Sequence, residues 1–298
     1  LFATGRADRE FLDRHATRAD ELERRSAPWT LARAAGVAGI PLADLERFVE
    51  LYAALSPAVV RCGWGLERNR NGGSAVAAVL ALPAVAGKFG VRGGGYTLSN
   101  SAAWKMNAQA ISGPEAPTRI INMNRLGATL TTTKERPIHL LFVYNSNALM
   151  TTPHQTLVRR GLEREDLFTI VFDQVLTDTA RYADLVLPAT TFLEHHELAR
   201  GYGSFVLQQI APVVPAVGQA RSNYSVFADL AVRTGVASRD EIPTETHAIE
   251  LILDSSGRGA DLQAELAEKG FARPAAGDRP VQFVDVFPRT DDRKIHLV

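Results

Sequence analysis

The sequence predicts an α/β fold with a doubly wound, mostly parallel sheet, an N-terminal helical segment and a small C-terminal helical extension. Two observations support this class. Ile138–Tyr144 and Leu167–Phe172 are nearly continuous apolar runs, a pattern typical of strands buried on both faces of a parallel sheet. Segments with helical periodicity alternate with such runs, and this alternation favours parallel pairing.

Residues 7–56 are expected to be helical. In Pro41–Tyr52, apolar residues recur at the spacing of one helix face, and Pro41 suits a first helical turn. Ser56-Pro57 should end this region. Ala58–Cys62 should then form a strand that leads into Gly63.

The same patterns predict the remaining elements. A helix is expected at Ser74–Gly87, kinked or shortened by Pro83, and the polar, aperiodic residues 96–135 suggest a long surface excursion. Further strands are expected at Leu185–Leu187 and Phe205–Leu207. Further helices are expected at Thr156–Gly161, Tyr224–Thr234, Glu245–Leu253 and Leu262–Gly270.

These elements suggest three segments. Residues 1–57 form a helical lead-in, residues 58–235 a Rossmann-like α/β domain, and residues 236–298 short helices and a linker-like stretch towards a further domain. The chain begins with Leu1 instead of Met and shows no signal-peptide pattern, so we expect a fragment of a longer protein.

Composition excludes several classes of partner and site. Lys plus Arg and Asp plus Glu balance at 33 each, so no overall field favours nucleic acid. The apolar run Ala75–Ala86 is shorter than the ~20 residues that cross a bilayer, so no membrane span is expected in this segment. A single cysteine, Cys62, provides neither an internal disulfide nor an iron–sulfur cluster.

Polar or glycine-rich groups follow three predicted strands. They are Gly63-Trp64-Gly65, Asn145-Ser146-Asn147 and Asp173. Ligands of doubly wound sheets bind outside the carboxyl ends of the strands. Glycines permit close approach of the backbone, short polar side chains suit phosphate, and a carboxylate suits ribose hydroxyls or guanine.

Each group also has a plain structural interpretation. Gly63 and Gly65 lack the third glycine of a dinucleotide fingerprint and could form a simple turn. Asn-Ser-Asn is common turn chemistry, and Asp173, Thr177 and Thr179 could be local caps. Their recurrence at successive strand ends favours a ligand site.

Glu194-His195-His196-Glu197 has the residue types of a metal site but not the spacing. Adjacent histidines on a helix point about 100° apart, and the His-Glu-x-x-His pattern is absent. A solvated or capping cluster is the favoured interpretation, and we assign neither metal ligands nor catalytic residues in this chain.

The block from Asp173 to Pro188, with its Thr-Asp-Thr-Ala and Ala-Asp-Leu-Val-Leu-Pro runs, resembles the signature of the molybdopterin oxidoreductases of the dimethyl-sulfoxide-reductase superfamily. The resemblance covers most of residues 5–235. Motifs in the same order support it: Cys62-Gly63-Trp64-Gly65 with Asn71-Gly72, Gly87–Gly90 with Gly93–Gly95, Leu141–Asn147, and Glu194.

This resemblance implies an oxidoreductase that holds molybdenum or tungsten on two pyranopterin guanine dinucleotides. Gly63, Trp64 and Gly65 would line the cofactor, and Asn145, Ser146 and Asn147 would contact phosphate and ribose. Asp173 would read the nucleotide end, Thr177 and Thr179 would support its turn, and Glu194 would be a carboxylate on the cofactor side. Ala148, His195 and Gly201–Ser204 depart from the family pattern.

The resemblance also implies parts outside this chain. A [4Fe–4S] cluster and the metal ligand would lie upstream and a second nucleotide-binding domain downstream, so the fragment alone should be inactive. We expect a small-molecule substrate, a redox partner, and electron-transfer subunits in some members of the family. We expect a cytoplasmic protein, and periplasmic export stays open. Two alternatives stay open: a molybdenum-free structural or electron-transfer subunit related to the iron–sulfur subunit of NADH dehydrogenase, and an unrelated NAD enzyme.

Overall fold

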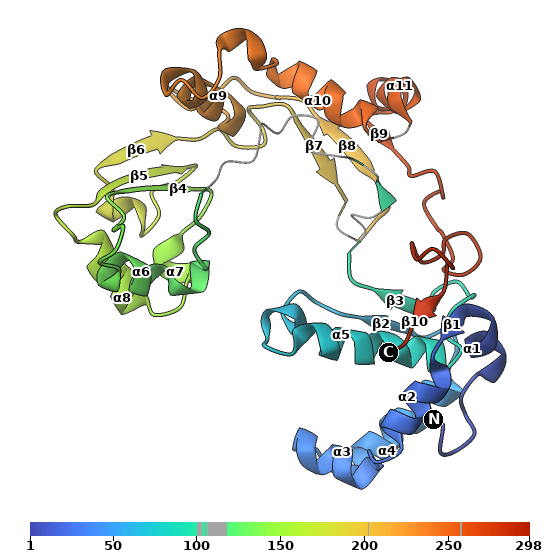
Figure 1. Ribbon diagram of the computed structural model, residues 1–298. Coiled ribbons are helices and arrows are strands. Elements are labelled where there is room, and N and C mark those ends of the chain that lie inside the picture. Colours follow the sequence, from blue (N-terminus) through green and yellow to red (C-terminus); the bar gives the residue numbers. More distant parts are fainter. Residues whose placement is uncertain (100–102, 105, 107–117, 202, 257) are drawn as a thin grey trace. The chain divides into compact units, whose positions relative to one another are not determined.

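The computed structural model describes residues 1–99, 103–104, 106, 118–201, 203–256 and 258–298 (Figure 1). The predicted α/β class is confirmed in this part of the chain, where parallel strands alternate with helices. Unit 1 comprises Leu1–Trp104, Arg200–Leu207 and Arg273–Val298, and unit 2 comprises Lys105–Ala199 and Gln208–Ala272. The two units are defined by which residues lie close together. The division into segments 1–57, 58–235 and 236–298 rests on functional grounds and stays a prediction.

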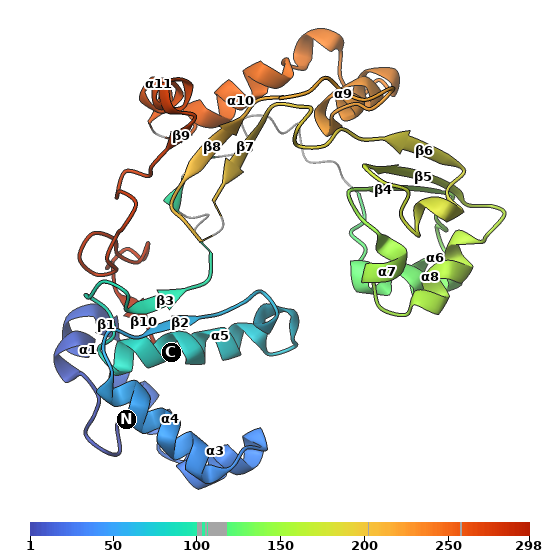
Figure 2. The same ribbon diagram turned by 180° about the vertical axis from the view of Figure 1, so that it is seen from behind.

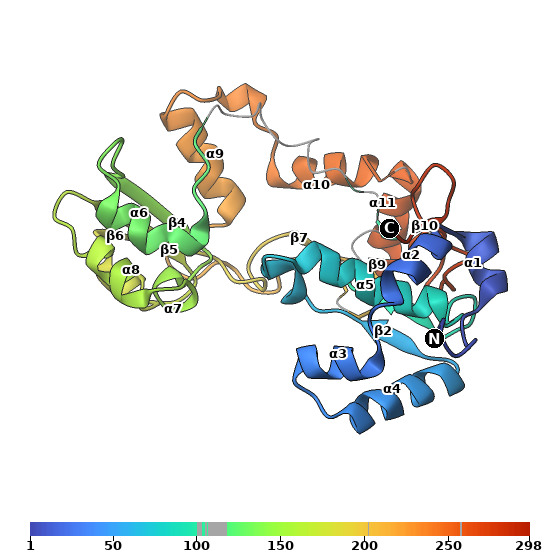
Figure 3. The same cartoon turned by 60° about the horizontal axis from the view of Figure 1, so that its bottom comes forward.

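Unit 1 begins with the helical region expected from the sequence. Its helices are α1 (Arg9–His15), α2 (Ala19–Ser26), α3 (Leu31–Ala38) and α4 (Leu42–Ala54), and α3 and α4 lie side by side (Figure 3). The Asp8 carboxylate accepts the N–H of Phe11 at 2.9 Å and so caps α1. The Thr30 hydroxyl oxygen caps α3 in the same way.

The core of unit 1 lies between α1 and α5 (Gly72–Val85), where Leu12, Ala84 and Val85 are buried. Strand β10 (Ile295–His296) pairs in parallel with β1 (Ala16–Thr17), and Leu297 joins the same core. The C-terminal stretch that the sequence suggests is linker-like therefore contributes apolar side chains to unit 1.

A second parallel pair in unit 1 joins β2 (Val59–Arg61) to β3 (Gly95–Thr97), with Val60 opposite Tyr96. A 3-10 helix (Leu66–Arg68) follows β2. The buried Lys88 ammonium donates to the carbonyls of Ala53 at 3.1 Å and Leu55 at 2.8 Å. These bonds satisfy carbonyl groups at the C-terminal end of α4, where a cation is favourable.

The central sheet of unit 2 is parallel and has the order β4-β5-β6. Its strands are β4 (Leu140–Tyr144), β5 (Phe168–Asp173) and β6 (Leu185–Pro188). The 3-10 helix Met123–Arg125 and α6 (Leu126–Thr132) precede β4. Helices α7 (Ala148–Thr151) and α8 (Gln155–Leu162) connect β4 to β5, and the 3-10 helix Ala180–Tyr182 connects β5 to β6.

Helices cover both faces of this sheet, as the doubly wound class requires (Figure 2). Val143 and Val171 face the group of α6, α7 and α8. Phe172 packs on the other face against Val226 of α9 (Asn223–Arg233). The predicted burial holds for Thr169, Val171 and Phe172 of β5, although Phe168 at its start is exposed. The predicted burial of both faces is wrong for β4, an edge strand whose Leu140 and Tyr144 are exposed.

Helix α6 lies within the stretch 96–135, for which the sequence predicts a surface excursion, and this prediction is wrong at residues 126–132. Leu130 is buried because α6 packs closely on α8. A Cβ atom at Gly127 would lie 2.7 Å from the main-chain nitrogen of Val158, and one at Gly161 would lie 2.5 Å from Cβ of Leu130. The two glycines permit this approach. Residues 100–102, 105 and 107–117 of the same stretch lie outside the described part.

The remaining elements include the helices expected near residues 245 and 262, which belong to unit 2, and a three-stranded sheet whose residues Arg200 and Leu207 are assigned to unit 1. Leu207, at the end of the predicted strand Phe205–Leu207, is instead the first residue of its observed strand and is fully buried. The elements are the sheet β7 (Glu197–Arg200), β8 (Leu207–Ile210) and β9 (Phe271–Ala272), the 3-10 helix Arg239–Glu241, and the helices α10 (Glu245–Asp254) and α11 (Gly259–Lys269).

Candidate functional site

The carboxyl ends of β4 and β5 lie next to each other in unit 2, because Tyr144 and Phe172 are partners in the parallel register. Directly after this pair, Asn145 adopts a left-handed conformation with φ of 50°, which asparagine tolerates better than most residues. Its N–H donates to the carbonyl of Phe172 at 3.1 Å. The chain therefore leaves β4 in a sharp turn that starts beside the end of β5.

Asn147 links this turn to the loop after β5. Its Oδ1 accepts from the N–H of Thr179 at 3.3 Å and from the Thr179 hydroxyl at 2.9 Å. Its Nδ2 donates to Asp178 at 3.2 Å. The hydroxyl of Thr179, which is fully buried, also accepts the N–H of Leu149 at 3.0 Å. The structure therefore joins two of the sequence-predicted clusters.

Asp173 ends β5 at the same edge of the sheet. Its Oδ1 accepts the N–H of Gln174 at 2.7 Å, and its main-chain carbonyl accepts the N–H of Ala189 after β6. Thr177 lies in the following loop, where its hydroxyl oxygen accepts the N–H of Ala180 at 3.2 Å. The loop is thus held by its own short-range bonds, as the capping interpretation of these residues expects.

Gly63, Trp64 and Gly65 belong to unit 1 and follow β2. The N–H of Cys62 donates to the carbonyl of Thr97, and this bond extends the pairing of β2 with β3 to the start of the turn. A Cβ atom at Gly63 or Gly65 would meet nothing within 4 Å, and neither residue has a positive φ. The fold of this chain therefore does not itself require glycine there, and Trp64 is 47% exposed.

Glu194 holds a turn together. Its carboxylate accepts from the N–H and the hydroxyl of Thr191, at 2.7 and 2.9 Å, and from the N–H of Val217 at 2.7 Å. These bonds from Thr191 and Val217 lower the pKa of Glu194 below its ordinary value of 4.5. Three donors of this chain thus already bind the carboxylate.

His195 joins a chain of side chains that the sequence interpretation missed. One ring nitrogen lies 2.8 Å from the hydroxyl of the buried Thr190, and the other lies 3.3 Å from Glu197. The carbonyl of Thr190 accepts from the amide of Gln174 at 3.2 Å. The corner after β5 is thereby tied to the loop after β6. In the sequence His195 directly follows Glu194, and this order does not indicate the contacts of His195 with Thr190 and Glu197.

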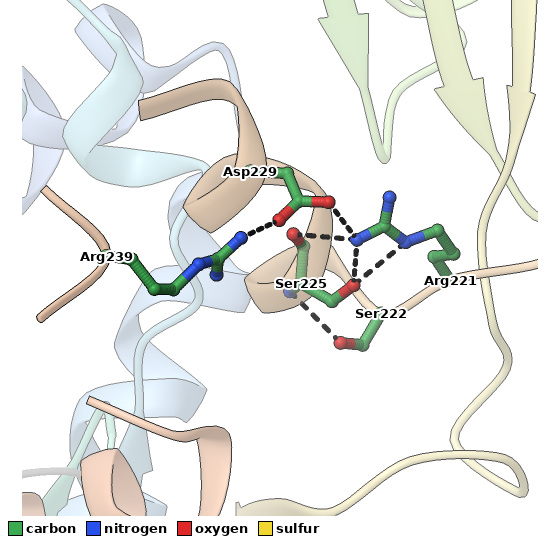
Figure 4. A network of polar contacts seen from close by, with 5 residues as sticks. All are labelled: Arg221, Ser222, Ser225, Asp229 and Arg239. Carbon is green, nitrogen blue, oxygen red and sulfur yellow. Dashed lines mark hydrogen bonds and ion pairs between the residues drawn. The ribbon is translucent and has the colours of Figure 1, made fainter. Parts of the chain in front are cut away.

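A second feature that the sequence did not reveal is the network around Asp229 (Figure 4). Asp229 binds the guanidinium groups of Arg239 and Arg221, the latter at 2.7 Å, and these bonds lower its pKa to about 2. The main chain of Arg221 bonds to Pro188, the last residue of β6, and to Thr190 just after it. Helix α9 is thereby fastened to the edge of the sheet where Asp173 lies.

Asp184, in the block from Asp173 to Pro188, has a structural role because it bonds to the main chain of β5. Its carboxylate accepts the N–H of Thr169 at 2.6 Å, and its own N–H donates to the Thr169 carbonyl at 2.9 Å. Thr169 is fully buried at the start of β5. Asp184 therefore sets the register of β6 on β5 at the end of the sheet opposite to Asp173.

In the described ranges, no group of three or more histidine, cysteine, aspartate or glutamate side chains has an arrangement that could hold a metal ion. Among the helices that the structure describes, none combines the length and the apolar character that a membrane crossing needs.

Comparisons with known proteins agree with this architecture. The chain is 33% identical over 282 residues to "Probable oxidoreductase YoaE" of Bacillus subtilis, with 89% of this chain and 41% of that protein covered. It is 26% identical to "Dimethyl sulfoxide/trimethylamine N-oxide reductase" of Cereibacter sphaeroides over 79% of this chain and 33% of that protein. The chain thus spans well under half the length of these relatives.

The fold resembles a solved structure, "Acetylene Hydratase from Pelobacter acetylenicus", with a TM-score of 0.68 at 21% identity, covering 92% of this chain and 43% of that chain. The family model described as molybdopterin oxidoreductase matches residues 18–233. The predicted family is therefore confirmed, and the chain belongs to the molybdopterin oxidoreductases.

Proposed function

We propose that this chain is the central cofactor-binding part of an oxidoreductase that holds molybdenum or tungsten on two molybdopterin guanine dinucleotides. The observation that carries the proposal is the joined pair of strand ends in unit 2. There the turn Asn145–Asn147 and the acid Asp173 lie at one edge of a parallel sheet, in a chain of the molybdopterin family. Ligands of such sheets bind at this edge.

The residues at this edge suit a guanine nucleotide. The Ser146 hydroxyl and the Asn145 amide can donate to phosphate or ribose oxygens, and Asp173 keeps acceptor capacity for ribose hydroxyls or guanine N–H groups. We extend the proposal to Gly63, Trp64, Gly65, Thr177 and Glu194, with the direct or supporting roles expected from the sequence. The open space beside Gly63 and Gly65 supports close approach of a ligand to the backbone.

When bound, the pterin-held metal would supply two-electron redox chemistry to a small substrate. The residues of this chain would bind and orient the cofactor and keep its nucleotide end fixed. We place a [4Fe–4S] cluster and the metal ligand in a preceding part of the whole protein. A redox partner, which in some complexes is an electron-transfer subunit, would exchange electrons with that cluster. The relatives named as reductases support the oxidoreductase class.

The decisive experiment measures the metal and nucleotide content of the full-length protein purified without oxygen. We expect molybdenum or tungsten together with about two releasable GMP per chain, since each pterin carries one nucleotide. Iron without molybdenum, tungsten or GMP would contradict the proposal and favour the molybdenum-free electron-transfer subunit.

A matched pair of variants tests the named edge of the sheet. Asp173→Asn should lower GMP content, because the amide replaces an acceptor by a donor. Asp240→Asn changes an exposed acid on the 3-10 helix Arg239–Glu241 of the same unit and should leave GMP content unchanged. Equal GMP content in the two variants would argue against a role for Asp173.

A further inference from the structure

The side chain of Asn147 is directed at its own chain. Oδ1 accepts two hydrogen bonds from Thr179, and Nδ2 donates one to Asp178. This pattern fixes the orientation of the amide, because a flipped amide would place its N–H groups against the N–H of Thr179. The main-chain carbonyl of Asn147 also accepts the N–H groups of Met150 and Thr151, each at 3.0 Å.

Thr179 completes the connection. Its hydroxyl donates to Asn147 and accepts the N–H of Leu149, and the residue is fully buried. A single side chain of the loop after β5 thus holds two positions, 147 and 149, of the turn and helix after β4. Thr179 therefore has no exposed surface with which to touch a ligand.

Ser146 and Asn145 differ from Asn147 in this respect. The structure gives their side chains no hydrogen-bond partner within the described part of the chain, and Asn145 is exposed. The turn therefore consists of two polar side chains free to meet a ligand and one that anchors them.

We infer that Asn147 and Thr179 are positioning residues of the nucleotide-binding edge, whereas Asn145 and Ser146 make the direct contacts. The inference rests on the proposed function, because it divides the residues of that same site into two roles. Thr179 acts through Asn147 and Leu149: it fixes where the turn leaves β4 and so fixes the position of Ser146.

The test compares Thr179→Val, Thr179→Ser and Ser146→Ala in cofactor-free full-length protein. Two quantities are measured: the dissociation constant for GDP, which carries the guanine, ribose and phosphate groups, and the hydrogen-exchange rate of the Leu149 amide. Thr179→Val removes the acceptor of this buried N–H, so its exchange should accelerate about tenfold or more and GDP should bind more weakly. Thr179→Ser keeps the hydroxyl and should restore both.

Ser146→Ala should weaken GDP binding while the Leu149 amide keeps its wild-type exchange rate. A charge-exchanged double variant, Asn147→Asp with Asp178→Asn, provides a second control. The new carboxylate at 147 can accept from Thr179, and the new amide at 178 can donate to it, so both exchange and GDP affinity should be kept.

Three results would overturn the inference. One is faster Leu149 exchange in Thr179→Val with unchanged GDP affinity, and another is loss of affinity in the double variant despite intact exchange, which would indicate direct contact by Asn147. The third is wild-type GDP affinity in Ser146→Ala. If wild-type protein neither binds GDP nor carries GMP, the proposed function fails and this inference with it, whereas the exchange rates still report on the hydrogen bonds themselves.

Discussion

The side-chain amide of Gln282 pairs with both main-chain polar groups of Tyr96. Its Oε1 accepts the Tyr96 N–H at 3.0 Å, and its Nε2 donates to the Tyr96 carbonyl at 2.8 Å. The amide thus takes the place of a neighbouring strand beside β3. The main-chain carbonyl of Gln282 also accepts the N–H of Gly90. A residue near the C-terminus thereby completes the hydrogen bonding of a strand formed far earlier in the sequence.

Gln282→Ala should therefore destabilise unit 1 by about 1–3 kcal/mol, since it leaves partly buried main-chain groups of Tyr96 without partners. Urea denaturation of the full chain measures this loss. Gln208→Ala is the control, because Gln208 is exposed on β8. Equal midpoints for the two variants would show that the Gln282 amide contributes nothing.

Asp229 should make the free energy of unfolding depend on pH in the acid range. Its pKa is lowered from 3.8 to about 2 by Arg239 and Arg221, so the folded chain holds this carboxylate charged where the unfolded chain protonates it. The contribution is present above pH 4 and is lost as the pH falls from about 4 through about 2. Asp229→Asn should flatten the fall of unfolding free energy in this window. Asp240→Asn should retain the wild-type slope, and a wild-type slope in Asp229→Asn would contradict the assignment.

Replacement of glycine by alanine should have opposite effects on stability at Gly161, where α8 packs closely on α6, and at Gly36, where the side of α3 is open. Gly161→Ala places a methyl group against Leu130 and should destabilise by about 1–3 kcal/mol. Gly36→Ala lies on α3, where the new Cβ meets nothing, and should stabilise by about 0.5–1 kcal/mol through helix propensity. Thermal unfolding measures both, and a neutral Gly161→Ala would mean that the helices can separate freely.

Gly63→Ala and Gly65→Ala should separate folding from cofactor binding. The added methyl groups meet no atom of this chain, so stability should change by less than about 0.5 kcal/mol. Metal and GMP content of the full-length protein should fall if the cofactor approaches the backbone there. Gly72→Ala, whose Cβ would lie 2.4 Å from the Leu66 carbonyl oxygen, should instead lose stability.

Local features of this chain were predictable from its sequence. β5 and α9 lie where the sequence places them, because a dense apolar run and a capped amphipathic stretch are decided by nearby residues. The turn at Asn145 and the acid at Asp173 follow for the same reason, since each directly ends an apolar run. Their adjacency comes from parallel pairing of successive strands.

Features that depend on distant residues were not predictable. Helix α6 is short and rich in threonine, and tertiary packing through Gly127 and Gly161 decides its burial. Gly95 begins β3, although the sequence there resembles a glycine-rich loop. The role of Thr179 depends on Asn147 and Leu149 after β4, and no local spacing encodes those partners.

The pairing of β1 with β10 has a consequence for synthesis on the ribosome. Ile295 is translated long after its partner Ala16, so the core around Leu12 must wait for the side chain of Leu297. The sheet of unit 2 needs partners only from nearby positions and can assemble during that wait. Unit 2 should therefore fold first in the cell, and the nascent N-terminal helices become natural clients for chaperones that shield apolar surface.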